Sequence, residues 1–145
     1  PDMYAELICD ESAVHVVPDI MKLYIRAKGV EKICLISDSM PSRTNYKNNE
    51  ARGVWYGSDL NYDDEGLLAG SRMTLENACR NLMTHTGYGL CHAIRMATLN
   101  PAKLLGIDYK VGSLAVGKKA NIIIIDDAVR VQKVFLEGEL MVDNT

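Results

Sequence analysis

The sequence has 145 residues, of which 48% are hydrophobic and 24% charged, and its formal net charge is -3. This length supports one domain with a core, and the composition excludes a disordered chain, which combines low hydrophobicity with high net charge. With 16 Lys and Arg against 19 Asp and Glu, the chain lacks the positive field of an electrostatic nucleic-acid binder. A complete (β/α)₈ barrel, which needs about 200 residues or more, is also excluded.

The sequence carries no signal for secretion or for a membrane. No basic and then apolar segment follows Pro1, and the longest aliphatic run, residues 122–125, is far shorter than the about 20 residues that cross a bilayer. The four cysteines have no CxxC spacing, and no Asn-X-Ser/Thr site occurs. We therefore predict a cytoplasmic protein, with no membrane partner and with reduced cysteines in its core.

The first third of the chain alternates strand and helix. Residues 5–10 and 31–38 are short apolar runs that each end on an aspartate. Between them, residues 18–28 form a predicted helix with Pro18 in its first turn and Gly29 as its stop. This order is typical of a βαβ unit with two parallel strands, the second of them covered on both faces.

The middle of the chain is more polar. Residues 39–53 predict a long surface loop, and residues 53–66 a hairpin flap. The acidic cluster of residues 63–65 allows a cation site, but three adjacent acids before a glycine are typical of a solvated loop tip. A helix with Ser71 or Thr74 as its cap is predicted next.

The last third predicts two helices and a small sheet. Residues 90–98 form the first helix, and Asn100-Pro101 supplies the N-cap and first residue of a second, shorter one. Residues 120–126, 129–136 and 139–142 then read as strands of an antiparallel sheet.

Two residues stand out for their chemistry. Asp38 lies at the carboxyl end of a predicted parallel strand, where α/β folds place active sites, and suits a general base, a metal ligand or a loop cap. His15 follows the other strand and shares that rim, so it either converges with Asp38 on one ligand or faces solvent. His85 and His92 flank a helix break and are interpreted as structural.

Two glycine-containing segments share features with ligand-binding motifs. Residues 68–71 precede a helix, and Gly70 permits close backbone approach to a ligand. Residues 112–118 match part of a P-loop, but Lys119 supplies no hydroxyl and a strand follows, so a turn is predicted.

Taken in order, these pieces resemble the C-terminal part of the N-acetylglucosamine-6-phosphate deacetylase family of the amidohydrolase superfamily. The resemblance covers essentially the whole chain. It rests on the motifs LICD (7–10), HVVP (15–18), ISDSM (36–40), GLLAGSRMTL (66–75), RMATLNPAKLLGI (95–107) and GSLAVGKKANIIIID (112–126).

The resemblance implies a metal-dependent hydrolase that converts N-acetylglucosamine 6-phosphate to glucosamine 6-phosphate and acetate. It implies that Asp38 is the catalytic acid and base and that His15 contacts the substrate. It also implies that Leu68, Ala69 and Gly70 lie against the bound sugar. A divalent metal ion, zinc or a similar one, is expected for the intact enzyme.

The chain departs from the family in two places. The family's turn is Asp-Gly-x-His, whereas Asp10 and His15 here are separated by four residues and no glycine. The family's metal ligands, a glutamate and two histidines, lie on earlier strands and have no match here, so no metal ligand is predicted in this chain. We therefore expect part of an enzyme, inactive in isolation.

The predicted fold class is α/β. Residues 1–110 are expected to form the C-terminal strands and helices of a (β/α)₈ barrel, and residues 111–145 part of a small antiparallel β domain. Because a partial barrel leaves open strand edges, a homo-oligomer is expected. Two alternatives remain: a non-catalytic, self-associating domain, and a deacetylase for another amino-sugar phosphate.

Overall fold

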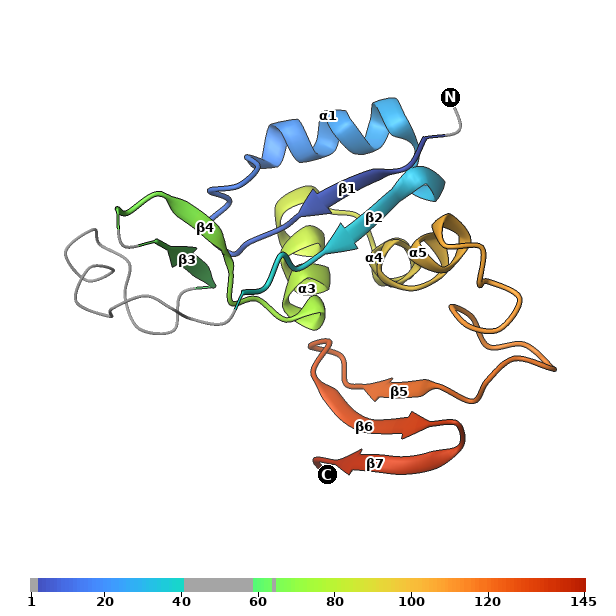
Figure 1. Ribbon diagram of the computed structural model, residues 1–145. Coiled ribbons are helices and arrows are strands. Elements are labelled where there is room, and N and C mark those ends of the chain that lie inside the picture. The colour runs from blue at the N-terminus through green and yellow to red at the C-terminus, as the bar shows by residue number, and fades with distance from the viewer. Residues whose placement is uncertain (1–2, 41–58, 64) are drawn as a thin grey trace.

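The computed structural model describes residues 3–40, 59–63 and 65–145. It contains a parallel strand pair with several helices, a hairpin, and a three-stranded sheet that carries the C-terminus (Figure 1). No helix in these ranges is long and apolar enough to cross a membrane. Most of the predicted surface loop of residues 39–53, much of the predicted flap and Asp64 lie outside the described residues.

The predicted βαβ unit is confirmed. Strand β1 (Ala5–Ile8) pairs in parallel with β2 (Ile33–Ile36), and helix α1 (Pro18–Lys28) connects them through the 3₁₀ turn η1 (Val30–Lys32). The helix occupies the predicted residues because Pro18 favours its first turn and Gly29, at φ 84°, ends it. Both strands are shorter than predicted, so each aspartate lies two residues beyond its strand.

The helices cover one face of this strand pair. Side chains alternate along a strand, and those of Leu7, Cys9, Ile33 and Leu35 share one buried cluster with residues of α1, α3 and α4. From α1 the cluster receives Met21 and Ile25. From α3 (Leu75–Thr86) and α4 (Leu90–Ala97) it receives Cys79, Leu82, Ala93 and Met96.

Helix α1 has a second apolar side that this cluster does not use. Ile20 is 51% exposed and Leu23 is 61% exposed, and their spacing of three residues places both on one side of the helix. The core instead takes Met21 and Ile25, one helical turn apart on the neighbouring face.

Residues 68–71, predicted to lead into a helix, form a strand. Strand β4 (Leu68–Ser71) pairs antiparallel with β3 (Leu60–Tyr62), so it is the second strand of the hairpin. The following helix, α3, begins at Leu75, and the hydroxyl of Thr74 caps it by accepting from the backbone N–H of Asn77 at 3.4 Å. Of the two predicted caps, Thr74 is therefore correct.

The predicted N-cap of the last helix is wrong. Helix α5 (Leu99–Leu104) is capped by Thr98, and Asn100 lies inside it. The Asn100 side chain is fully buried and donates to the carbonyl oxygens of Val30 at 2.7 Å and Ile33 at 2.6 Å. These bonds join α5 to η1 and to the start of β2, a tertiary role that outweighs the preference of asparagine for a cap.

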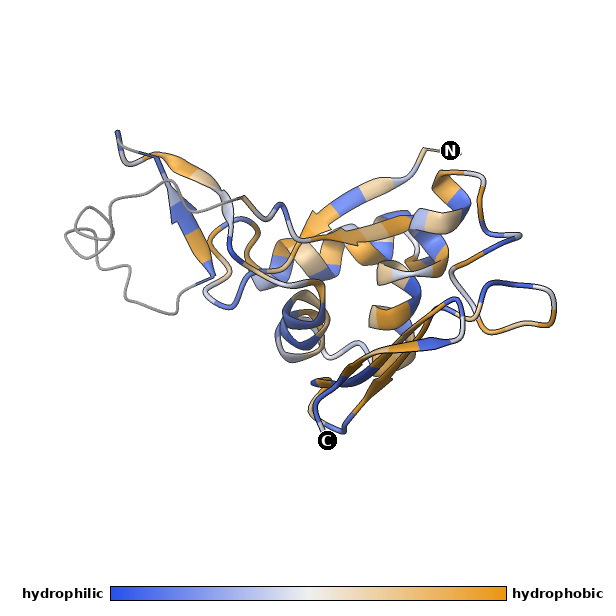
Figure 2. Cartoon of the chain, turned by 60° about the horizontal axis from the view of Figure 1, so that its bottom comes forward, coloured by the Kyte–Doolittle hydropathy of each residue, from blue (hydrophilic) through white to orange (hydrophobic). Residues whose placement is uncertain are grey.

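The predicted antiparallel tail is confirmed as β5 (Ile122–Ile125), β6 (Val131–Leu136) and β7 (Glu139–Asp143), in that order. Hydrophobic residues run along all three strands (Figure 2), and several are exposed, among them Ile123, Leu140 and Met141. The P-loop-like segment before this sheet is a turn, as predicted, with Gly112 and Gly117 at φ 86° and 88°.

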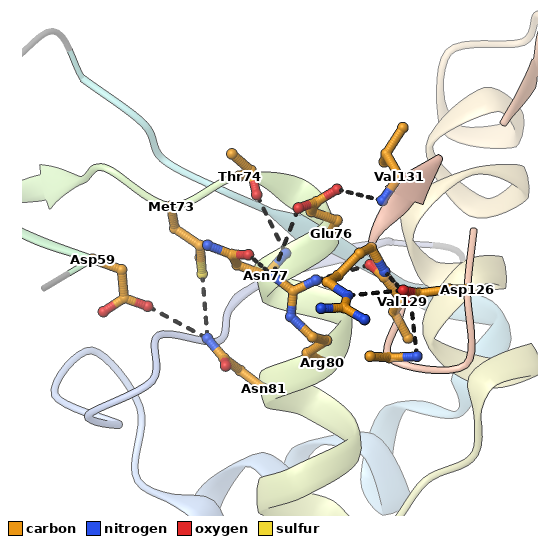
Figure 3. Close-up of polar contacts among 12 residues, drawn as sticks. Asp59, Met73, Thr74, Glu76, Asn77, Arg80, Asn81, Asp126, Val129 and Val131 are labelled. Atoms are coloured by element: carbon orange, nitrogen blue, oxygen red, sulfur yellow. Dashed lines mark hydrogen bonds and ion pairs between the residues drawn. The ribbon is translucent and has the colours of Figure 1, made fainter. Parts of the chain in front are cut away.

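An arginine on α3 joins the three-stranded sheet to the helices (Figure 3). Arg80 donates to the Val129 carbonyl oxygen at 2.8 Å, and Glu76 accepts from the Val131 N–H at 3.3 Å. Arg80 and Glu76 also pair at 3.6 Å, one helical turn apart.

Candidate functional site

The carboxyl ends of β1 and β2 meet at one edge of the parallel pair. Because Ile8 is opposite Ile36 in the register, Asp10 and Asp38 each lie two residues beyond paired positions. His15 follows Asp10 in the loop before α1. The structure therefore places the two residues singled out in the sequence, Asp38 and His15, on one rim.

Asp10 organises the loop that carries His15. Its side chain is fully buried, and Oδ1 accepts from the Val14 N–H at 2.8 Å. Its Oδ2 lies 3.0 Å from both the backbone nitrogen and Nδ1 of His15. Burial disfavours the charged carboxylate, but the bonds from Val14 and His15 outweigh it and lower the pKa of Asp10.

These contacts define the state of the His15 ring. An ionised carboxylate can only accept, so Nδ1 carries the proton that bonds to Asp10. In the neutral ring, Nε2 is then an acceptor. Nε2 is buried and has no hydrogen-bond partner among the described residues. A buried polar atom without a partner is costly, which suits an atom that bonds to a ligand.

Asp38 has an unusual backbone conformation that the hairpin supports. Its φ is 49°, in the left-handed region that aspartate tolerates better than most residues. Its carbonyl oxygen accepts from the Ser71 N–H at 2.7 Å. The hydroxyl of Ser71 donates to the Ser37 carbonyl oxygen and accepts from the Met73 N–H. Strand β4 thus holds the chain on both sides of Asp38.

The carboxylate itself is exposed. Among the described residues, no hydrogen bond or ion pair occupies the Asp38 side chain. It is therefore open to a ligand at the rim, unlike the fully engaged carboxylate of Asp10.

Of the three predicted sugar contacts on β4, Gly70 lies beside Asp38. A Cβ at position 70 would come within 2.7 Å of the Asp38 carbonyl oxygen and 3.5 Å of its Oδ2. Ala69 is half-buried, and Leu68 is 39% exposed and pairs with Tyr62. The close approach expected at Gly70 is therefore made to Asp38 within the chain.

Three polar residues near this rim were missed or understood only in part. Asp59 is 8% exposed, and its Oδ2 accepts from the Glu11 N–H at 2.7 Å. Asn81 donates to the Cys9 carbonyl oxygen at 2.9 Å and reaches Asp59 Oδ2 at 3.4 Å (Figure 3). His85 Nε2 lies 3.0 Å from the Asp10 carbonyl oxygen. His85, interpreted from the sequence as structural, thus supports the end of β1 next to the candidate site.

The sequence contains a signal for two of these three residues. Asn81 and His85 are four residues apart on α3, so they lie on one face of that helix and point toward the same strand end. Asp59 has no local signal, because its partners come from parts of the chain far away in sequence. His92 is exposed and packs edge-on against Tyr88.

The described residues do not provide a metal centre. They contain no group of three or more His, Cys, Asp and Glu side chains that could hold a metal ion. Near the rim, Asp10 uses both carboxylate oxygens and His15 uses Nδ1 within the loop. No catalytic step is therefore assigned to a metal from this part of the chain.

The chain is similar to known proteins over most of its length. Residues 6–141 match the sequence profile of the amidohydrolase family. The chain is 34% identical over 143 residues to a protein of Escherichia coli (strain K12) named as a candidate N-acetylgalactosamine-6-phosphate deacetylase. That match covers 94% of this chain and 82% of that protein.

The same identity, 34% over 143 residues, is found with the N-acetylgalactosamine-6-phosphate deacetylase of Escherichia coli O157:H7, covering 94% of this chain but 36% of that protein. The crystal structure of N-acetylglucosamine-6-phosphate deacetylase from Pasteurella multocida superposes with a TM-score of 0.82 at 27% identity. The superposition covers 99% of this chain and 38% of the Pasteurella multocida chain. The chain therefore spans less than two fifths of these two proteins.

The structural likeness confirms the predicted fold. The parallel pair and its helices are the C-terminal part of a (β/α)₈ amidohydrolase barrel, and the antiparallel sheet is the tail of a small β domain. The boundary predicted between residues 110 and 111 remains a prediction.

Proposed function

The chain belongs to the amidohydrolase family, and from that membership we propose that its natural protein deacetylates an N-acetylated amino-sugar 6-phosphate. The substrate is N-acetylglucosamine 6-phosphate or its galactosamine epimer, and the products are acetate and the free amino sugar. The names of the relatives support this class of substrate. The arrangement of Asp38 carries the proposal within this chain.

Amide hydrolysis needs a group that moves a proton from the attacking water to the leaving nitrogen. We assign that role to Asp38. Its carboxylate accepts the proton as the water oxygen bonds to the acetamide carbon, and it returns the proton to nitrogen as the carbon–nitrogen bond breaks. The exposed carboxylate, on a backbone held by Ser71 and Gly70, supports this assignment.

We assign substrate binding to His15. With Nδ1–H bonded to Asp10, the neutral ring offers Nε2 as an acceptor for a sugar hydroxyl. That this buried nitrogen has no hydrogen-bond partner in the described part of the chain supports the assignment. The segment from Leu68 to Gly70 is proposed to lie against the sugar, since Gly70 already lies beside Asp38.

Amidohydrolases are generally metal-dependent, and a divalent metal such as zinc is proposed for the intact enzyme. Its ligands are proposed to lie on strands that precede this chain, and the described residues contain no group of three or more His, Cys, Asp and Glu side chains that could hold the ion. Chelation of the natural protein, followed by addition of single divalent metals, identifies the metal that activity requires.

The deciding experiment measures acetate release by the natural polypeptide that carries this sequence, with each epimer of the N-acetylated sugar phosphate as substrate. Asp38→Asn should lower kcat by about 10²–10⁴-fold, the usual contribution of a general acid and base, with a small change in KM. The fold should be unaffected, because the side chain is exposed. A variant with full activity would remove Asp38 from the mechanism.

We also propose that the natural protein is a homo-oligomer. The exposed apolar residues Ile20 and Leu23 on α1 support association with a second copy. Its mass in solution tests this proposal, and a monomer at micromolar concentration would contradict it.

A further inference from the structure

The loop between β1 and α1 is held to the rest of the chain at its tip. The Ala13 N–H donates to the Asp10 carbonyl oxygen at 3.1 Å, so residues 10–13 form a β-turn. Glu11 and Ser12 are the central residues of this turn, and both are exposed. At Glu11, the backbone N–H bonds to Asp59 Oδ2 at 2.7 Å, across 48 residues of sequence.

Asp59 is itself fixed to the hairpin. Its carbonyl oxygen accepts from the Arg72 N–H at 2.9 Å, directly after β4. Its Oδ2 also lies 3.4 Å from Asn81 Nδ2, which bonds to the Cys9 carbonyl oxygen at the end of β1. One buried carboxylate therefore connects the His15 loop with the hairpin.

The same hairpin holds the catalytic candidate. Gly70 contacts Asp38, and the Ser71 N–H bonds to the Asp38 carbonyl oxygen at 2.7 Å. A displacement of the loop relative to the hairpin would change the separation of His15 from Asp38. The Asp59 link restrains that displacement.

Stability alone does not account for a charged group at this position. Asp59 Oδ1 is buried and has no hydrogen-bond partner among the described residues, which is costly for a carboxylate. A buried carboxylate oxygen without a partner calls for an explanation other than stability, and a positioning role provides one.

We propose that Asp59 is a positioning residue. Through the Glu11 N–H, it sets the place of the substrate-binding His15 relative to Asp38. This inference rests on the proposed function for the roles of His15 and Asp38. It concerns substrate binding, so the effect belongs in KM more than in kcat.

The hydrogen bond between the Glu11 N–H and Asp59 can be removed without changing Asp59 itself. Glu11 is the second residue of a β-turn, and neither Glu11 nor Ser12 has a positive φ, so proline fits position 11. Glu11→Pro removes the N–H donor to Asp59 together with the Glu11 side chain. Glu11→Ala keeps that donor and is the matched control, because the Glu11 side chain is exposed.

Kinetics of the natural polypeptide supply the first measurement. Glu11→Pro and Asp59→Ala should each raise KM for the sugar phosphate about tenfold, the worth of one good hydrogen bond, with kcat changed less than about threefold. Asp59→Asn keeps an oxygen acceptor for Glu11 and should restore KM to near the natural value. Equal KM for Glu11→Pro and Glu11→Ala would overturn the proposal.

The ¹⁵N resonances of the His15 ring supply the second measurement, which does not depend on turnover. In the natural protein they should show the Nδ1–H tautomer fixed by Asp10. In Glu11→Pro they should keep that tautomer, because Asp10 and His15 belong to the same loop, so that a raised KM reports displacement of the loop and not loss of the Asp10 bond. Loss of the Nδ1–H tautomer in Glu11→Pro would overturn the positioning role, whereas full activity of Asp38→Asn would overturn only the proposed chemistry.

Discussion

Gly70 lies so close to Asp38 that any side chain at position 70 would overlap the Asp38 backbone. A Cβ at position 70 would lie 2.7 Å from the Asp38 carbonyl oxygen and 2.8 Å from Met40 Cγ, and the φ of Gly70 is +73°. The hairpin and the end of β2 therefore form one unit, in which a backbone without a side chain supports the candidate catalytic residue.

Gly70→Ala should cost about 2–4 kcal/mol of unfolding free energy, because it combines a strained φ with an overlap that involves backbone. Gly87→Ala is the matched control: its φ is +77°, and nothing lies within 4 Å of the added Cβ. The control should lose about 1–2 kcal/mol. Urea-induced unfolding measures both, and equal losses would show that the contact with Asp38 adds nothing.

Asp10 should make the stability of the fold depend on pH in the acid range. Its pKa in the folded chain is lowered from 3.8, because the bonds from Val14 and His15 outweigh its burial. The unfolded state thus binds the proton more readily, so stability rises with pH. The contribution of Asp10 is fully present above its unfolded pKa and is lost as the pH falls through its folded pKa.

Asp10→Asn tests this dependence. At pH 7 it should lower the unfolding free energy by about 1–3 kcal/mol, since the N–H groups of Val14 and His15 lose a charged acceptor. The loss should shrink as the pH falls from the unfolded pKa of 3.8 toward and through the lower pKa of the folded chain. Urea unfolding at several pH values provides the comparison, and a loss independent of pH would contradict the assigned ionisation.

The helices and strands that were predicted correctly are those determined by residues close together in the sequence. Helix α1 has its predicted bounds because Pro18 and Gly29 act on their own neighbours. The parallel pair and the antiparallel tail follow from short apolar runs and the connections between them. Asp38 and His15 share a rim for the same reason, since parallel strands end at one edge.

The predictions that were wrong or missing concern residues whose partners are distant in the sequence. Asn100 resembles an N-cap, but it binds carbonyl oxygens about seventy residues away along the chain. Asp59 and Glu11 meet across 48 residues. Residues 68–71 form a strand because β3 pairs with them, which their own composition does not reveal. Such contacts depend on the assembled fold.

The cysteines should differ sharply in reactivity. Burial, with smaller effects of the Asp10 charge and of Cys79, raises the pKa of Cys9 to about 12, and burial likewise raises that of Cys79 to about 11. Cys34 is also buried and its pKa is raised, whereas Cys91 is exposed. Because thiolates are the reactive form, Cys91 should be the one that reacts with a thiol reagent at pH 8.

Mass spectrometry of the labelled peptides measures this difference. In the native protein the label should be found on Cys91, and in urea on all four cysteines of this sequence. Rapid native labelling of Cys9 would show that the β1 end opens more readily than its burial indicates. All four thiols are free in the structure, as predicted, although Cys91 lies outside the core.

Asn100 should be the most sensitive asparagine in the helices. It is fully buried and donates to the Val30 and Ile33 carbonyl oxygens at 2.7 and 2.6 Å. Asn100→Leu would remove the buried amide donor from both carbonyl oxygens, at a cost of about 2–4 kcal/mol of unfolding free energy. Asn144→Leu is the matched control, because Asn144 also donates to a carbonyl oxygen, that of Val131 at 3.0 Å, but is exposed. Water replaces its lost bond, so the control should lose less than about 1 kcal/mol. Similar losses at both sites in urea unfolding would mean that α5 is not held to β2 through Asn100.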